Sequence, residues 1–194
     1  MIRVLLATLV LLLAGCASVP PAPPRPAQVQ AVSFALNGRI AVRYDGKHSS
    51  GGVHWQHDAK SDEILLLAPL GQTVARISRT TRFDVQQTPL QVYTLDTDDR
   101  HYAAPDAESL TEKVLGWRLP LEGLQYWVLG LPLPGEPFDG QRMQSGEWEV
   151  LHQDGWTIRY TRYAAQSADS LPLRMELQRA NLKIRLLIDE WQIK

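Results

Sequence analysis

Apolar and polar residues alternate along residues 34–44, and this pattern predicts a β-strand. Apolar side chains occupy even positions, such as Phe34, Ile40 and Val42, while Arg39 occupies an odd one. A period of two gives a strand one apolar face and one polar face. Similar alternation or short apolar runs predict further strands at residues 53–56, 63–67, 74–78, 82–86 and 91–95, with turns at 45–46 and 50–52.

Two hairpins are predicted nearer the C-terminus. Alternation over residues 173–178, a short turn at 179–181 and renewed alternation over 182–188 predict the first. Residues 148–151 and 156–160 predict the second, because the Asp-Gly pair between them favours a tight turn.

The middle of the chain breaks this pattern. Apolar residues over 107–115 have helical spacing, with a start signal at Asp106 and a stop signal at Gly116. A second helix is predicted from Leu121 to near Gly130. Helices inserted into a run of antiparallel strands indicate an α+β fold, mainly β, with the helices against one face of the sheet.

The N-terminal segment predicts export. Residues 4–14 are apolar after a basic residue, but a helix that spans a bilayer needs about 20 residues, so residues 1–15 are expected to be a signal peptide. They end in Leu13-Ala14-Gly15 before Cys16, which resembles a bacterial lipobox and implies a lipid on the Cys16 sulfur. The alternative is an ordinary secretory signal beside a stray cysteine.

Residues 16–32 are expected to link the lipidated Cys16 to one domain at residues 33–194. Five prolines in this stretch favour an extended chain that could reach about 50 Å. The alternative is a disordered tail without a role. Position 17 is Ala rather than Asp, and an Asp there would resemble an inner-membrane retention signal, so the outer membrane is the expected destination.

Composition and charge exclude several classes of function. The chain has 194 residues, and 20 Lys and Arg against 21 Asp and Glu argue against nucleic acid as a partner. No nucleophile-elbow, zinc-protease or phosphate-loop motif occurs. His54 and His57 should point to opposite faces of a strand and so cannot share a metal ion.

Acidic residues give no stronger signal for chemistry. Asp96, Asp98 and Asp99 lack the Gly and Glu of an EF-hand and are expected to form a solvated turn. Glu147 and Glu149 should share one face of a strand, a spacing compatible with paired carboxylates, but no cleft is visible in the sequence. We therefore expect no enzyme, no metal site and no cofactor.

Several strings, in order along the chain, resemble the LolB family of outer-membrane lipoprotein receptors. They are Gly38-Arg39-Ile40-Ala41-Val42, the stretch L-L-L-A-P-L-G-Q-T from Leu65, the stretch P-L-x-x-L-x-x-W-V-L-G-L-P from Pro120, Met175-Glu176-Leu177, and I-R-L-x-I-x-x-W from Ile184. The resemblance covers nearly the whole of residues 33–194.

This resemblance implies a fold and a function. The expected fold is a half-open antiparallel β-barrel, in which the helices act as a lid over an apolar cavity. The expected function is to accept acylated lipoproteins from the periplasmic chaperone LolA and insert them into the outer membrane, without catalysis or ATP. The partners would be LolA, the acyl chains of its cargo and outer-membrane lipid, and the protein is expected to be a monomer on the periplasmic face.

The candidate functional residues are mainly apolar. The acyl-pocket candidates share a place on predicted apolar faces, although plain core is the alternative for each: Phe34, Leu36, Ile40, Val42, Trp55, Trp127, Ile158, Tyr160, Met175, Leu177, Ile184 and Leu186. Leu70 stands in a Pro-Leu-Gly turn that should project it into solvent. The family carries an exposed leucine for membrane insertion in this loop, and packing onto the core is the alternative. A lipid-anchored scaffold without a cavity and a lipid-anchored hydrolase remain open as other functions.

Overall fold

The structure, a computed structural model, describes residues 33–167 and 169–193. The expected signal peptide at 1–15, the lipid-attachment site at Cys16 and the linker up to residue 32 lie outside the described residues. No helix in the described part of the chain combines the length and the apolar character needed to cross a membrane.

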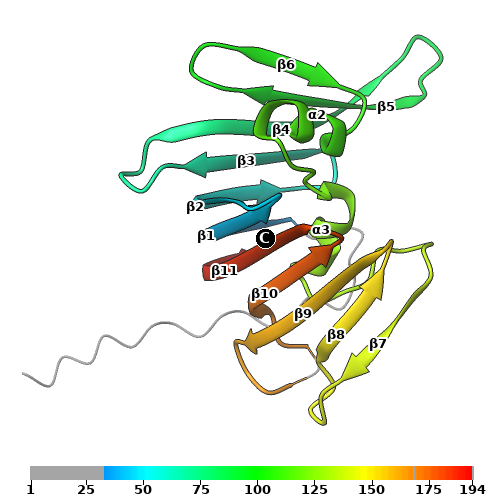
Figure 1. Cartoon of the computed structure of the whole chain (residues 1–194). Helices are drawn as coiled ribbons and strands as arrows, with labels where there is room; N and C mark the ends of the chain where they lie inside the picture. Colours follow the sequence, from blue (N-terminus) through cyan, green and yellow to red (C-terminus); the bar gives the residue numbers. More distant parts are fainter. Residues whose placement is uncertain (1–32, 168, 194) are drawn as a thin grey trace, which may run out of the picture.

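Eleven antiparallel strands form one sheet (Figure 1). In chain order they are β1 (Phe34–Tyr44), β2 (Lys47–His57), β3 (Ser61–Leu67), β4 (Thr73–Phe83), β5 (Pro89–Asp96), β6 (His101–Ala104), β7 (Phe138–Arg142), β8 (Trp148–Gln153), β9 (Trp156–Tyr163), β10 (Pro172–Arg179) and β11 (Leu182–Ile193). Their order across the sheet is β6-β5-β4-β3-β2-β1-β11-β10-β9-β8-β7. The first and last strands are therefore neighbours at the centre.

Two helices lie between β6 and β7 in the sequence, α2 (Ala107–Leu115) and α3 (Leu121–Trp127). The Asp106 side chain accepts a hydrogen bond from the backbone N–H of Ser109 at the start of α2, and Gly116 ends this helix with a φ of 81°. Both helices pack against one side of the twisted sheet, which we call the inner face (Figure 1).

The mainly β, α+β class is confirmed, and the sheet is open and does not close into a barrel. Its edge strands, β6 and β7, do not pair with one another. Every residue of β7 is exposed, so this strand has no apolar face that would draw it toward the other edge. The helices instead cover the inner face.

Both predicted hairpins are confirmed, as β8–β9 and β10–β11. The predicted strands 74–78 and 82–86 are wrong as separate elements, because β4 runs unbroken to Phe83 and a turn follows. Buried Arg79 interrupts the apolar pattern within this strand. The expected turn at 50–52 is also wrong, since these residues pair within β2, where a Cβ at Gly51 would collide with the carbonyl oxygen of Leu67.

Candidate functional site

The inner face carries apolar side chains in register across four strands. Residues directly opposite each other on paired strands project from the same face. One row across β9, β10, β11 and β1 contains Tyr160, Met175, Leu186 and Ile40. The next row contains Ile158, Leu177, Ile184 and Val42. Eight of the candidate residues therefore form one continuous apolar surface.

The remaining four candidates border this surface. Leu36 lies opposite Trp55 in the pairing of β1 with β2, and the rings of Phe34 and Trp55 meet edge to face at 5.1 Å. Trp127 comes from α3, and the hydroxyl of Tyr160 donates a hydrogen bond of 2.9 Å to its carbonyl oxygen. The structure thus brings all twelve candidates together.

A void of about 20 Å³ lies between the centre of the sheet and the helices. This volume holds roughly one water-sized sphere, so the space has no room for an acyl chain. All side chains around the void are apolar: Leu36, Ile40, Val53, Trp55, Ile64, Leu66, Trp117, Leu119, Leu124, Leu177, Ile184 and Leu186. The inner face is therefore almost completely packed beneath the helices.

Half of the residues around the void were not among the candidates. Ile64 and Leu66 follow the alternation of β3, which could have indicated them. Trp117 and Leu119 lie in the link between α2 and α3. Apolar residues have no regular spacing there that would indicate which side chains are buried. Their burial comes from the position of the helices over the sheet.

Helix α3 is held firmly to β8. The indole N–H of Trp127 donates to Oε1 of Gln153 over 2.9 Å, and the same buried oxygen accepts from the backbone N–H of Leu133 over 2.7 Å. The Gln153 amide donates to the carbonyl oxygens of Leu133 and Glu136. In α3 itself the Trp127 ring lies over Gly123, where a Cβ would collide with it.

An exposed ion pair links helix α2 to the end of β10. Its Glu108 lies 3.7 Å from a guanidinium nitrogen of Arg179 at the end of β10, and Arg179 also lies 3.9 Å from Asp154. These side chains are partly exposed, and such ion pairs contribute little to stability. The contact can therefore break at low cost in free energy.

A buried polar cluster fixes Trp55 at one end of the inner face. The Asp62 carboxylate accepts hydrogen bonds from the Trp55 indole over 2.8 Å, from Nδ1 of His57 over 2.7 Å and from Nε of Arg79. Phe34 stacks on the His57 ring at 4.8 Å. Removing one partner of such a cluster is costly, because it leaves a buried charge uncompensated.

Tyr93 on β5 faces helix α3. Burial, together with the charge of Glu122, raises the pKa of the Tyr93 phenol to about 12. Its hydroxyl lies 3.5 Å from a carboxylate oxygen of Glu122. The buried Tyr93 phenol is therefore more stable in its neutral, protonated form than as a phenolate.

The β3–β4 loop projects Leu70 from the protein. The backbone N–H of Gly71 donates to the carbonyl oxygen of Ala68 over 2.8 Å, and that of Ala68 donates to Gln72 over 2.8 Å. Pro at the second position and Gly at the fourth suit this turn. The Leu70 side chain is 87% exposed.

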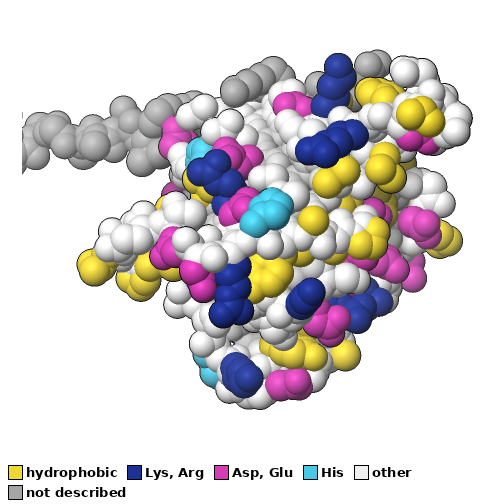
Figure 2. Space-filling model, turned by 90° about the horizontal axis from the view of Figure 1, so that it is seen from above, with side chains coloured by type: hydrophobic (Ala, Val, Ile, Leu, Met, Phe, Trp, Pro, Cys, Tyr) yellow, Lys and Arg dark blue, Asp and Glu magenta, His cyan; other side chains and the backbone are white. Residues whose placement is uncertain are grey.

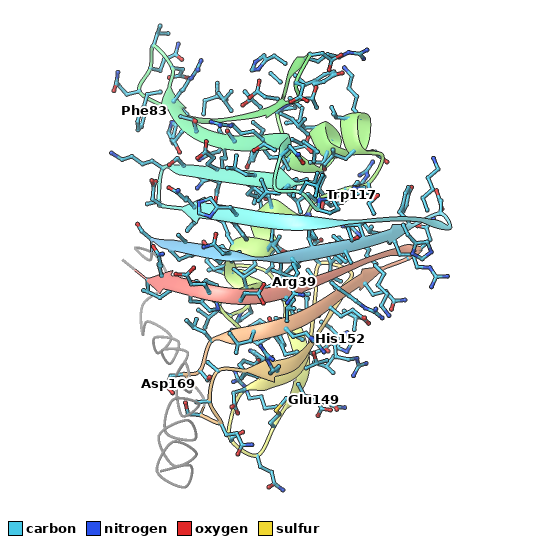
Figure 3. The ribbon with its side chains drawn as sticks, turned by 90° about the vertical axis from the view of Figure 1, so that its left-hand side faces the viewer. Arg39, Phe83, Trp117, Glu149, His152 and Asp169 are labelled. Carbon is cyan, nitrogen blue, oxygen red and sulfur yellow. The ribbon has the colours of Figure 1, made fainter. Side chains whose placement is uncertain are left out.

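An open hollow of about 850 Å³ lies beside this loop. Gly51 and Gly52 on β2 help to form it, because they place no side chains there, and Leu67, Pro69 and Arg39 also line it. Arg39 pairs with Asp189 at 3.0 Å and lies near the middle of the sheet (Figure 3). The acyl-pocket candidates Ile40, Met175 and Leu186 also line this hollow, although its two glycines were assigned to a turn.

The polar residues considered for chemistry are separated in space. His57 joins Asp62, whereas His54 lies against Asn37. The expectation for Glu147 and Glu149 is wrong, because Glu147 is buried ahead of β8 and Glu149 is exposed on it. Among the described residues, no group of three or more His, Cys, Asp or Glu side chains could hold a metal ion.

Comparisons with known proteins find relatives over most of the chain. A family model described as "Outer membrane lipoprotein LolB" matches residues 32–191. Proteins named outer-membrane lipoprotein LolB are similar to the chain. The one from Chromobacterium violaceum is 39% identical and covers 98% of both chains, and the one from Nitrosomonas europaea is 40% identical over 82% of this chain and 72% of its own.

Among solved structures, a DUF1329 family protein from Desulfovibrio piger is 8% identical with a TM-score of 0.49, covering 85% of this chain and 86% of its own. The family model spans almost all of the described residues. The extent and identity of these matches show that the chain belongs to the LolB family of outer-membrane lipoproteins.

Proposed function

We propose that this protein accepts acylated lipoproteins from the periplasmic chaperone LolA and inserts them into the outer membrane. The observation that carries the proposal is the continuous apolar inner face, whose two rows of side chains run in register beside α3 and the link that precedes it. The process needs no catalysis and no ATP, because each transfer moves the acyl chains to a more favourable apolar environment.

The energetics explain why such a surface is required. Each buried methylene contributes about 0.8 kcal/mol, so an acyl chain of about 15 methylenes gains about 12 kcal/mol when it leaves water. A lipoprotein with several chains therefore needs an apolar carrier at every step. Tighter binding at each later step would give the transfer its direction.

The helices would act as the lid over an acyl cavity. The void beside Trp117, Leu119 and Leu124 lies where such a cavity would open between the helices and the sheet. The contact between α2 and β10 would break first, since the Glu108–Arg179 pair is exposed, whereas buried Gln153 holds α3 to β8. An acyl chain would displace helical side chains from the inner face.

Leu70 would carry out insertion, and the lipid on Cys16 would keep the protein at the outer membrane. An apolar side chain at the tip of a rigid turn gains little from the folded protein but gains free energy in lipid. Mass spectrometry of the protein purified from membranes should find the mature chain beginning at a lipidated Cys16. An unmodified Cys16, or cleavage elsewhere, would refute the anchor.

A transfer assay tests the proposal directly. Radiolabelled lipoprotein in complex with LolA is mixed with liposomes, with or without this protein, and the label in each fraction is measured. Label should move to the liposomes only when this protein is present. If the label stays with LolA, the receptor role is wrong and a lipid-anchored scaffold becomes the better description.

A further inference from the structure

The β4–β5 hairpin ends in a second exposed apolar group, which we call the hairpin tip (residues 83–90). Its large apolar side chains are Phe83, Val85 and Leu90, which are 61%, 93% and 57% exposed. In the view of Figure 2, hydrophobic side chains reach the surface at the projecting left-hand end of the molecule and again at its upper right. Figure 1 places the β3–β4 loop and the β4–β5 hairpin at these opposite ends of β4.

The hairpin tip is ordered by its own hydrogen bonds. The Asp84 carboxylate accepts from the backbone N–H groups of Gln86 and Thr88 over 2.9 and 2.8 Å. The Asp84 backbone also exchanges hydrogen bonds with Thr88 and Gln87. Asp84 is the only charged residue between Phe83 and Leu90, so its carboxylate serves the turn and the rest of the tip is uncharged.

The apolar side chains occupy both faces of the hairpin tip. Phe83 lies opposite Pro89, and Arg82 lies opposite Leu90, so Phe83 and Leu90 point to opposite faces. A flat protein surface could cover only one of these faces. An apolar medium that surrounds the tip would cover both, with Arg82 placed at the boundary to meet lipid phosphate.

The hairpin tip lies at the end of the sheet where the described chain begins. Phe34, His57, Asp62 and Arg79 form one row across β1, β2, β3 and β4. Phe83 follows Arg79 in β4 and therefore extends beyond this row, and Figure 3 shows it at one margin of the sheet. The segment that leads back to Cys16 thus joins the domain at the same end as the tip.

We propose that the hairpin tip inserts into the lipid surface to which the protein is anchored, as a contact separate from Leu70. β4 spans about 33 Å between the two contacts. The residues between Cys16 and Phe34 can extend to about 50 Å, so the anchor permits both ends of β4 to reach one membrane. The proposal rests on the anchor at Cys16, but not on the role of Leu70.

Site-specific quenching tests this contact in the full lipidated protein. A Val85→Cys chain is purified from membranes, labelled with an environment-sensitive fluorophore and reconstituted into vesicles of phosphatidylethanolamine and phosphatidylglycerol. The probe should shift its emission to the blue, lose intensity with nitroxide-labelled lipid and resist quenching by aqueous iodide. Phe83→Ser with Leu90→Ser in the same chain should reduce the lipid quenching.

Two matched chains make the result specific. Glu149→Cys places the probe at an exposed position of β8, where iodide should quench it and nitroxide lipid should not. The unsubstituted chain should take up no label, because Cys16 is its only cysteine; labelling there would show a failure of the anchor instead. A probe at 85 that iodide quenches fully overturns the proposal. Shielding that requires added LolA also overturns it and makes the tip a protein-docking surface.

Discussion

Trp127 donates its indole N–H to Gln153 over 2.9 Å, and this hydrogen bond joins α3 to β8. Gln153 is buried and satisfies three further backbone groups of the segment after α3. One side chain therefore fixes both the helix and the chain that leaves it.

Replacing this glutamine should destabilise the protein. Gln153→Leu keeps a similar volume but leaves the Trp127 indole and three backbone groups without their partner, so we expect a loss of about 3 kcal/mol in the free energy of unfolding. Urea unfolding measures it. His152→Ala, at the exposed neighbouring position, should change the free energy by no more than about 0.5 kcal/mol. Equal stability of the two variants would show that α3 is held by packing alone.

Trp127 should report the arrival of an acyl chain. Its ring is buried against Trp156 at 6.2 Å, and an acyl chain under the helices would change the surroundings of both. Adding a fatty-acid analogue should shift the tryptophan emission, and the shift should be smaller in Trp127→Phe. Because five other tryptophans contribute, the difference spectrum between the two proteins is the quantity to measure. An unchanged difference spectrum would remove Trp127 from the acyl pocket.

Leu70→Glu should separate reception of cargo from its insertion. Burying one leucine in lipid is worth about 2 kcal/mol, and a carboxylate at the same place is penalised by more than that. Cargo should still pass from LolA to the variant, while delivery into liposomes falls and loaded receptor accumulates. Stability should change by no more than about 0.5 kcal/mol, because the position is exposed.

Gln72→Glu provides the matched control for Leu70→Glu. It places the same charge in the same exposed loop but keeps the leucine. Delivery by this control should remain close to that of the original protein. Normal delivery by Leu70→Glu would show that the loop has no part in insertion, and a large loss of stability would show that Leu70 belongs to the core.

Tyr93 should make the fold sensitive to alkaline pH. Its pKa is raised from 10.0 to about 12 in the folded protein, mainly by burial. The folded state therefore holds this proton more tightly than the unfolded state does. The stability that depends on it is fully present below pH 10.0 and is lost as the pH rises toward about 12.

Absorbance titration of the tyrosines provides the measurement for Tyr93. The folded protein should show a late step in phenol ionisation to which Tyr93 contributes, and Tyr93→Phe should lower its amplitude. Tyr126→Phe is the control, since Tyr126 lies in α3 but is not fully buried. A late step of unchanged amplitude in Tyr93→Phe would mean that Tyr93 does not contribute to it.

The helices and strands that were predicted correctly are those marked by residues within or next to the element itself. The helix over 107–115 was correct at both ends because Asp106 and Gly116 mark them in the sequence itself. The β10–β11 hairpin was correct because alternation persists on both sides of a short turn. By contrast, β7 has no buried residue and therefore no alternation to detect.

Features that depend on distant residues escaped prediction. β4 was divided because Arg79 is buried, which is favourable because Asp62 on the neighbouring strand, together with Asp58 and Gln91, accepts its hydrogen bonds. The inner face was predicted to line an apolar cavity under a helical lid, but how far this space is filled depends on where Trp117 and Leu119 lie. Nothing in the spacing of these two residues determines their position over the sheet.

The pairing of β1 with β11 also determines when the protein can fold. Phe34 at the beginning of the described chain pairs with Ile193 near its end, so the centre of the sheet forms only after the last strand has been synthesised. Pairing between such distant segments is slow, because closing a long loop has a large entropic cost. A nascent chain that lacks β11 cannot join the two halves of the sheet, so the complete fold waits for the last strand.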